Sequence, residues 1–320
     1  MISMKEHSVT ITLTVRNMSG TIEKCVDSLI NQNYKNKKIF VTDAFSTDGT
    51  FEKLEKYGNR IILERIKGNM SKAYNYMIKK VNTEFIAFTD ADCTLDKNWL
   101  KILINSFEED VIAVGGTVST PKSANKLQTV IGKELESRYK RFPRFVKRLP
   151  TMNICVRTDI AKRIKFNENL DVVQETEWNY KLGKFGKIAF NPRARLVHYH
   201  RSSLKGYIKQ QFRYGVFVPQ VYLTKEHFGK ITGDNISTSI MPLQLALILL
   251  IILSSLLTFL FDQLYQLTTL LLLVLFLSYI FDSLRITKDV SEIILLLFLF
   301  FLRNAIWFIG IAYGALKMLF

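Results

Sequence analysis

The sequence predicts an α/β domain built on a mostly parallel sheet, followed by a segment embedded in a membrane. Three observations lead to this prediction. Short β-branched and apolar runs alternate with amphipathic stretches as far as Val118. One of these runs, residues 85–90, leads into two carboxylates spaced i, i+2, Asp90 and Asp92. Beyond Met241 the chain becomes strongly apolar over lengths close to the ~20 residues that cross a bilayer.

The elements of the α/β part follow in order along the chain. Ser19 is a candidate cap for the first helix, and residues 46–50 form a turn that opens the second. We expect strands at 9–15, 38–43, 61–64, 85–90 and 111–118, with helices from Ile22 to Ile30, after Thr50 and at 71–81. This alternation predicts a sheet covered on both faces, which binds ligands at the carboxyl ends of its strands.

The pair Asp90 and Asp92 is the first candidate site. Alternate residues of a strand share a face, so both carboxylates can point into one crevice. Hard cations such as Mg²⁺ and Mn²⁺ prefer these oxygen ligands and often bridge substrate phosphates. A lone Asp-x-Asp also caps helices and closes turns, which is the competing interpretation.

Three apolar runs, at about 242–261, 265–281 and 293–316, are apolar all round, unlike most helices of soluble proteins. Buried core helices are the alternative. The loop after the second run carries Arg285 and Lys288, so the positive-inside rule predicts three crossings with the N-terminus inside and the C-terminus outside. We expect the preceding part of the chain to be cytosolic, because its start lacks the apolar core of a signal peptide. Arg303 and Asn304 lie inside the third run and indicate helix contacts or a tilted span.

The net charge of +16 is concentrated between Lys122 and Lys230. Basic clusters beside membrane spans indicate an anionic leaflet or phosphorylated substrates. The predicted spans argue against the other interpretation of a basic protein, nucleic-acid binding. The three cysteines have no metal-ligand spacing and are expected to be reduced thiols.

Residues 41–50, with Asp43 and Asp48-Gly49, followed by Asp90-Ala91-Asp92, resemble the family 2 glycosyltransferases of the GT-A fold. The resemblance covers roughly the first 215 residues. It implies an inverting transferase that binds the nucleoside through Thr14, Arg16 and Asp43, and the diphosphate through Asp90, Asp92 and a divalent metal, Mn²⁺ or Mg²⁺. Val15 stands where the family usually has proline, and Ala44 where a second carboxylate is common.

Two further stretches resemble family segments near the substrates. Residues 68–75 look like the Gly-rich helix start that lies against the nucleotide, with Lys72 adding positive charge; an ordinary helix capped by Ser71 is the alternative. Residues 151–157 resemble the segment that lines the acceptor side, which places Asn153 there.

The acidic stretch 174–178 resembles the Glu-Asp-x-Glu motif whose Asp is the catalytic base. The matching residue is Glu175, with Glu177 in reserve, and the neighbouring Trp178 would face the acceptor. A carboxylate opposite the leaving group is needed to take the proton of the acceptor hydroxyl. An acid-rich helix start, favoured by the helix dipole alone, is the competing interpretation.

Two basic and aromatic segments complete the resemblance. His198 lies where some relatives have an additional metal ligand. Gln210, Arg213 and Tyr214 resemble the Gln-x-x-Arg-Trp motif of cellulose and hyaluronan synthases, in which Arg213 would neutralise the departing diphosphate. The aromatic and basic residues from Lys205 to Phe228 predict a helix in the headgroup layer.

The sequence therefore predicts a GT-A domain over 1–203, interfacial amphipathic helices over 204–240 and transmembrane helices over 241–320. We expect a multi-pass cell-membrane enzyme whose catalytic domain lies at the inner leaflet. It moves a sugar from a nucleotide-sugar to a membrane-associated, lipid-linked glycan acceptor. A homo-oligomer is compatible with this prediction, and nucleic acid is not an expected partner. A processive polysaccharide synthase and an inactive nucleotide-sugar-binding scaffold are the alternatives.

Overall fold

The computed structural model describes residues 6–222 and 240–319 of the 320-residue chain. Its internal contacts divide the chain into two compact units. The first unit comprises residues 1–123 and 139–200, and the second comprises residues 124–138 and 201–320.

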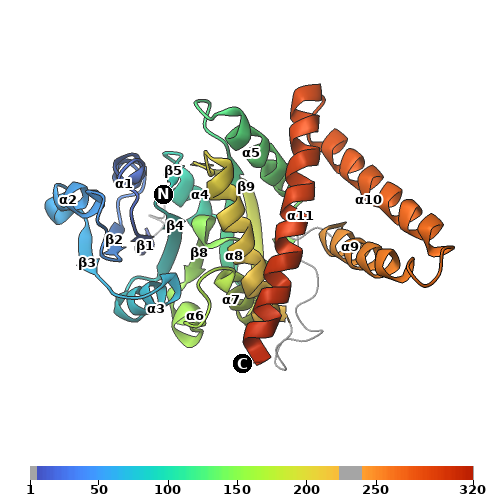
Figure 1. The fold of residues 1–320 in the computed structure, drawn as a ribbon. Coiled ribbons are helices and arrows are strands. Elements are labelled where there is room, and N and C mark those ends of the chain that lie inside the picture. The colour runs from blue at the N-terminus through green and yellow to red at the C-terminus, as the bar shows by residue number, and fades with distance from the viewer. Residues whose placement is uncertain (1–5, 223–239, 320) are drawn as a thin grey trace. The chain divides into compact units, whose positions relative to one another are not determined.

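A nine-stranded mixed sheet forms the centre of the first unit, with the strand order β3-β2-β1-β4-β8-β6-β9-β5 and β7 paired to β9 (Figure 1). The first four strands in this order are parallel, whereas β8 enters antiparallel between β4 and β6. The strands are β1 Val9–Val15, β2 Lys37–Asp43, β3 Ile62–Arg65, β4 Phe85–Asp90, β5 Cys93–Leu95, β6 Val111–Ser119, β7 Phe145–Val146, β8 Ile154–Arg157 and β9 Lys187–His198.

The helices of this unit begin close to the predicted positions, but neither the predicted cap Ser19 nor the alternative cap Ser71 holds that position. Thr21, not Ser19, precedes the first helix, and Asn69, not Ser71, caps the third by accepting a hydrogen bond from the backbone N–H of Lys72. The helices are α1 Ile22–Ile30, α2 Thr50–Glu55, α3 Met70–Lys80, α4 Trp99–Ile104, α6 Thr158–Arg163 and α7 Gln174–Leu182. Single 3₁₀ turns lie at Gly58–Arg60 and Thr151–Asn153.

Parallel pairing brings the carboxyl ends of three strands to one level. Thr14 on β1 is in register with Asp90 on β4, and Val15 is in register with Asp43 on β2. The strands are held there by a core in which Ile11, Leu13 and Phe88 are fully buried. Burying each such side chain stabilises the fold by roughly 1.5–3 kcal/mol, so the polar residues at the strand ends rest on a rigid base.

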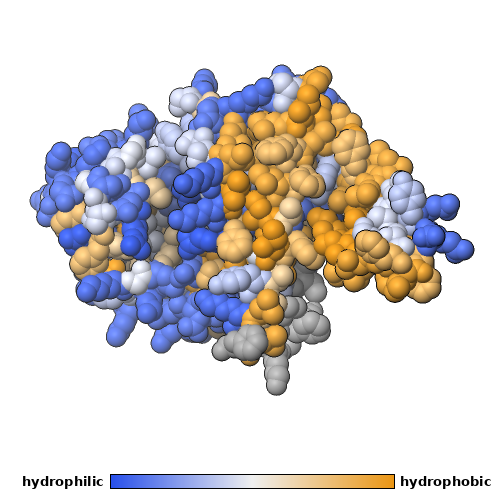
Figure 2. All heavy atoms as spheres, in the orientation of Figure 1, coloured by the Kyte–Doolittle hydropathy of each residue, from blue (hydrophilic) through white to orange (hydrophobic). Residues whose placement is uncertain are grey.

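The second unit is helical. It consists of α5 Lys126–Tyr139, which belongs to it as far as Arg138, α8 Leu204–Tyr222, α9 Ile240–Leu257, α10 Leu264–Ile286 and α11 Val290–Leu319. The last three are long and apolar enough to cross a membrane, and Figure 2 shows the hydrophobic surface gathered over this part of the chain. Residues 223–239 of the predicted interfacial segment, Phe228 among them, lie outside the described residues.

Candidate active site

Asp92 and His198 meet beside the carboxyl end of β4, the strand that Asp90 ends. Asp90 ends β4, and Asp92 lies in the turn before β5. Because β5 pairs antiparallel with β9, with Cys93 opposite His198, the imidazole lies next to the Asp92 carboxylate, Nε2 to Oδ1 at 3.4 Å. The backbone N–H of Tyr199 donates to the Asp92 carbonyl at 2.8 Å and fixes this arrangement.

The environment of Asp90 favours its protonated form. Burial, followed by the nearby Asp92 carboxylate, raises the pKa of Asp90 to about 7, while His198 acts in the opposite direction. The Tyr74 hydroxyl of α3 donates to Oδ1 of Asp90 at 3.4 Å. Two carboxylates this close repel each other unless a cation lies between them, which is the electrostatic condition of a metal site.

The donor atoms around Asp92 suit a divalent cation of intermediate hardness. Ligand atoms of Asp92, Cys93 and His198 lie within 4.8 Å of one another. Burial and then Asp92 raise the pKa of the Cys93 thiol well above its usual range, so the thiol stays protonated and is a poor ligand. The remaining set, carboxylate and imidazole, fits Mn²⁺ and tolerates Mg²⁺.

Asp43, at the end of β2, is a completely buried carboxylate. Its Oδ2 accepts from the Ser46 backbone N–H at 3.0 Å and from Arg65 Nε at 3.3 Å. Its buried Oδ1 has no hydrogen-bond partner among the residues that the structure describes. A buried acceptor of this kind is costly unless a ligand completes it, so the geometry suits an incoming nucleoside donor group.

Arg65 was not predicted from the sequence as a site residue. Its guanidinium lies over the rings of Phe45 and Phe51, at 4.7 and 4.2 Å from their centroids, as well as beside Asp43. The available signal was a basic residue at the end of the strand next to β2. This residue can be assigned to the site only when the order of the strands is known.

The loops that follow β1 and β2 are tied to each other. Asn17 N–H donates to Ser46 Oγ at 2.9 Å, and Met18 N–H donates to Thr50 Oγ1 at 2.8 Å. The predicted donor-binding residue Thr14 is half-buried beside Asp90, and Arg16 is exposed. These hydrogen bonds hold the two loops together next to Arg16 and Asp43.

Lys72 lies in the first turn of α3, where Asn69 anchors the helix start. The Asn69 amide donates to the Glu168 carbonyl at 2.7 Å and to Asp171 Oδ1 at 3.0 Å. This network ties the helix start to the segment before α7 and leaves Lys72 exposed.

The two acidic candidates of α7 have different environments. Glu177 is 4% exposed, forms an ion pair with Lys181 and accepts from Asn167 Nδ2 at 2.9 Å. Glu175 is half-buried, and its charge is one of the smaller causes that raise the pKa of Asp90. Glu175 is thus the more accessible of the two carboxylates.

Two residues predicted on the acceptor side lie in the core. Trp178 is 1% exposed and stacks on Phe166 with ring centroids 4.4 Å apart. Asn153 is fully buried: its Oδ1 accepts from Trp99 Nε1 at 2.8 Å, and its Nδ2 donates to the Thr117 carbonyl at 2.9 Å. These contacts make both side chains part of the packed core.

Backbone strain is concentrated around these residues. In the described parts of the chain, three non-glycine residues have a positive φ: Asn17 (54°), Phe45 (54°) and Val173 (56°). Asn17 follows Arg16, Phe45 follows β2 after Asp43, and Val173 immediately precedes α7. A β-branched residue such as Val173 is a particular outlier in this region, and such strain is typical of functional sites.

Gln210, Arg213 and Tyr214 share one face of α8 in the second unit. Tyr207, Gln211, Gly215 and Pro219 are among the buried residues of the same helix. Arg213 is exposed, whereas Gln210 and Tyr214 are half-buried. The helix therefore presents the three motif residues together.

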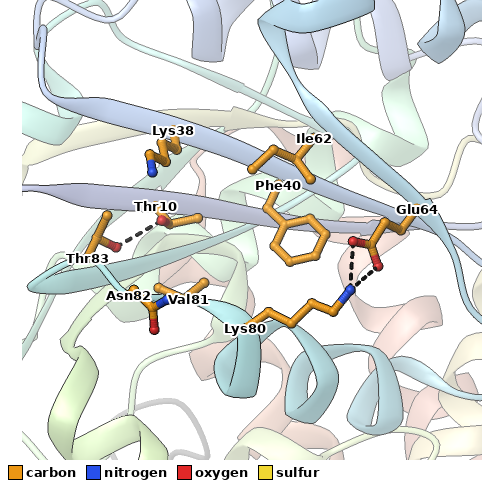
Figure 3. Close-up of a pocket in the computed structure, with 9 residues that line it drawn as sticks. All are labelled: Thr10, Lys38, Phe40, Ile62, Glu64, Lys80, Val81, Asn82 and Thr83. Carbon is orange, nitrogen blue, oxygen red and sulfur yellow. Dashed lines mark hydrogen bonds and ion pairs between the residues drawn. The ribbon is translucent and has the colours of Figure 1, made fainter.

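A separate cavity of about 230 Å³ lies near the opposite ends of the strands. Figure 3 shows Lys80 of α3 reaching Glu64 of β3 beside the Phe40 ring, and all three residues line the cavity. Its lining includes none of the predicted site residues. The cavity and the acidic cluster are therefore distinct.

The family model described as "Glycosyl transferase family 2" matches residues 10–170. Among curated relatives, the dolichyl N-acetyl-alpha-D-glucosaminyl phosphate 3-beta-D-2,3-diacetamido-2,3-dideoxy-beta-D-glucuronosyltransferase of Methanococcus voltae is 26% identical over 231 residues, 65% of this chain and 71% of the relative. The poly-beta-1,6-N-acetyl-D-glucosamine synthase of Staphylococcus aureus is 27% identical over 154 residues, 47% of this chain and 37% of the relative. Glycosyltransferase GlyA of Streptococcus pneumoniae is 29% identical over 125 residues, 37% of this chain but only 18% of the relative. The chain thus spans less than half the length of two of these three relatives.

Two solved structures share the fold. The mannosyltransferase PcManGT from Pyrobaculum calidifontis, in complex with GDP-Man and Mn²⁺, has a TM-score of 0.53 at 16% identity over 99% of this chain and 88% of that one. S. aureus TarS 1-349, in complex with UDP-GlcNAc, has a TM-score of 0.51 at 15% identity over 97% and 92%. Together with the match over half of the sequence, these similarities confirm the predicted GT-A fold. The chain belongs to glycosyl transferase family 2.

Proposed function

We propose that the protein transfers a sugar, with inversion, from a nucleotide-sugar to a lipid-linked glycan acceptor at the membrane. The observation that carries this proposal is the contact of Asp92 with His198 beside Asp90, at the level of the sheet where the buried Asp43 also lies. The names of two relatives, a dolichyl-linked glucuronosyltransferase and a polysaccharide synthase, support a membrane-associated acceptor.

The residues of the first unit divide the work. Asp43, Thr14 and Arg16 bind the nucleoside, and Lys72 offers positive charge to the diphosphate. Asp90, Asp92 and His198 would hold Mn²⁺ or Mg²⁺, which when bound supplies Lewis-acid stabilisation of the leaving diphosphate. Mn²⁺ accompanies GDP-Man in the Pyrobaculum structure.

Glu175 takes the proton of the acceptor hydroxyl as that oxygen attacks the anomeric carbon. The new bond joins the acceptor oxygen to this carbon, the bond to the diphosphate oxygen breaks, and the nucleoside diphosphate leaves on the opposite face. A single displacement of this kind inverts the anomeric configuration. Arg213 would neutralise the leaving diphosphate, and Gln210 and Tyr214 would contact the acceptor.

The chain is proposed to consist of a cytosolic catalytic domain (1–203), an interfacial segment (204–240) and a membrane segment (241–320). A processive polysaccharide synthase is the second candidate, because Gln210, Arg213 and Tyr214 share one face of α8. The product separates the two functions: one added sugar for the first, a ladder of lengths for the second.

The function is tested with detergent-solubilised full-length protein and a panel of UDP-, GDP- and dTDP-sugars, with Mn²⁺ or Mg²⁺ and a lipid extract as acceptor. We expect transfer from one donor, lost on addition of EDTA and lost in Asp92→Ala. Nucleotide binding without any transfer across the panel, unchanged by Glu175→Gln, would support a scaffold instead.

A further inference from the structure

The helix α11 has two sharply different faces. Leu296, Leu299, Arg303, Asn304 and Gly310 are buried against the rest of the second unit. Between Ile294 and Leu316 the large exposed side chains form an apolar stripe over less than half of the helix circumference, at 3.6 residues per turn. They are Ile294, Phe298, Phe301, Ile309, Tyr313 and Leu316, each between 47% and 63% exposed.

The helix α8 runs alongside the second half of α11 (Figure 1). Gln211 accepts from Trp307 Nε1 at 2.9 Å, and an added Cβ on Gly314 would lie 2.1 Å from the Val216 carbonyl. The contacts advance along both helices in the same direction, so the two are parallel. Close approach of the backbones at glycines leaves little freedom to separate them.

This packing places charges beside the middle of α11. The Phe212 carbonyl lies against Gly310, so the next residue, the exposed Arg213, is level with the stretch from Trp307 to Tyr313. That stretch is within about 14 Å of Asn304 along the axis. Arg303 itself pairs with Glu134 of α5 at 3.5 Å.

An upright α11 would carry these groups into the hydrocarbon. The centre of its apolar run is near Asn304, and the half-thickness of a bilayer core is about 15 Å. Each charged residue at that depth costs roughly 2.5–3.5 kcal/mol on insertion scales. Exposed Lys209 and Arg213 would both pay this penalty.

The α9–α10 pair meets α11 in a way that does not suit three upright spans. Gln244, near the start of α9, accepts from Asn304 Nδ2 at 3.0 Å. Tyr279, in the last third of α10, accepts from the same amide at 2.9 Å. The midpoint of α11 thus contacts the open end of the hairpin, and Figure 1 shows α9 and α10 leaving α11 towards their shared turn.

We infer that α9 and α10 cross the membrane, whereas α11 lies along the membrane–water interface with its apolar stripe in the lipid. The occupant of that stripe is the bilayer itself. The C-terminus is then on the same side as the catalytic domain, and α8 presents Arg213 at the depth of phosphate headgroups. The three-crossing topology expected from hydropathy places the C-terminus on the opposite side.

The sidedness of the full-length protein tests this inference. The native cysteines are buried, so a membrane-impermeant maleimide reports single introduced cysteines in sealed vesicles. We use the exposed positions Lys97→Cys in the first unit, Asp262→Cys in the hairpin turn and Lys317→Cys near the C-terminus. Lys317→Cys should label from the same side as Lys97→Cys, and Asp262→Cys only after permeabilisation. Labelling of Lys317→Cys together with Asp262→Cys overturns the inference.

Depth along the stripe gives a second, independent readout. Spin labels at Ile294→Cys, Phe301→Cys, Ile309→Cys and Leu316→Cys, in full-length protein in nanodiscs, should report similar shallow depths by oxygen and nickel accessibility. A profile that is deepest at Phe301 and Ile309 and shallow at both ends contradicts an interfacial helix. Neither readout depends on glycosyl transfer, so the inference stands or fails separately from the proposed function.

Discussion

Glu175 and Glu177 are two positions apart on α7, yet their environments predict opposite consequences of the same substitution. Glu175→Gln should keep donor binding and lower transfer by about 10²–10⁴-fold, the usual contribution of a general base. Glu177→Gln is the matched control: it weakens the ion pair with Lys181 and should lower the melting temperature while the folded fraction stays active. Donor binding is followed by titration calorimetry and transfer by product formation. Equal transfer in wild type and Glu175→Gln would remove Glu175 from the mechanism.

The raised pKa of Asp90, about 7, makes metal binding depend on pH. Below pH 7 a cation must displace a proton, so the affinity for Mn²⁺ should rise with pH and level off above 7. The stability of the metal-free protein should change with pH in the opposite direction. Between pH 4 and 7 its folded state binds more protons than the unfolded state, so its unfolding free energy falls as the pH rises. Calorimetry and thermal melts with and without Mn²⁺ measure both slopes, and Asp90→Asn should abolish them.

For individual residues, the sequence predicted the chemical type of a site side chain better than the direction in which that side chain points. Asp92 and His198 lie side by side because β5 pairs with β9, a pairing that the sequence did not predict. Residues two apart on a helix point in nearly opposite directions, so Glu175 and Glu177 could not both face the site. Arg65 was not predicted as a site residue because its contact with Asp43 depends on the order of the strands in the sheet.

Among the elements, the start of α7 is strained at Val173, whose φ is 56°. A left-handed conformation costs a non-glycine residue roughly 1–2 kcal/mol. We expect Val173→Gly to leave stability unchanged or raise it by up to about 1 kcal/mol, since glycine's own backbone entropy offsets part of the gain. Transfer should fall, because the helix start that carries Glu175 becomes less rigid.

The control for this substitution lies at the other end of the same helix. An added Cβ at Gly183 would approach nothing closer than 3.6 Å, so Gly183→Ala should change neither stability nor transfer appreciably. Unfolding in detergent and initial rates provide the comparison. A clear loss of stability in Val173→Gly would show that the valine side chain, and not the backbone, matters there.

The regular elements were largely predictable, whereas their assembly was not. β1 and β4 have the predicted ends, because each is a compact apolar run bounded by polar residues. The antiparallel entry of β8 between β4 and β6 could not be read from Ile154-Cys155-Val156, since pairing depends on residues far away in the sequence. The basic stretch that begins at Lys122 contains a helix, α5, whose contacts lie in the second unit.

In the molecule as a whole, α5 belongs to the second unit although its neighbours in the sequence, β6 and β7, belong to the first. It is encoded between β6 and β7, yet its Lys133 pairs with Glu292 at the start of α11, 2.6 Å apart. Its Glu134 reaches Arg303, whose side chain is only 6% exposed. These ion pairs therefore link α5 to α11 within the second unit.

The pair of Glu134 and Arg303 makes this link testable, because its two partners are not equivalent. Glu134 also pairs with Arg138, so Arg303→Met leaves a carboxylate that still has a cation. Glu134→Leu instead leaves a buried guanidinium without this carboxylate and should cost roughly 3–5 kcal/mol. The double variant should be more stable than Glu134→Leu alone, because it removes the uncompensated charge.

Unfolding of full-length protein in nanodiscs gives the four corners of this double-mutant cycle. Lys126→Leu, an exposed charge on the same helix, is the control and should change stability by no more than about 0.5 kcal/mol. Additive effects of the two substitutions would mean that Arg303 is held by Gln244 and Asn304 alone. In that case α5 rests on α11 by apolar packing, and the buried ion pair does not fix its position.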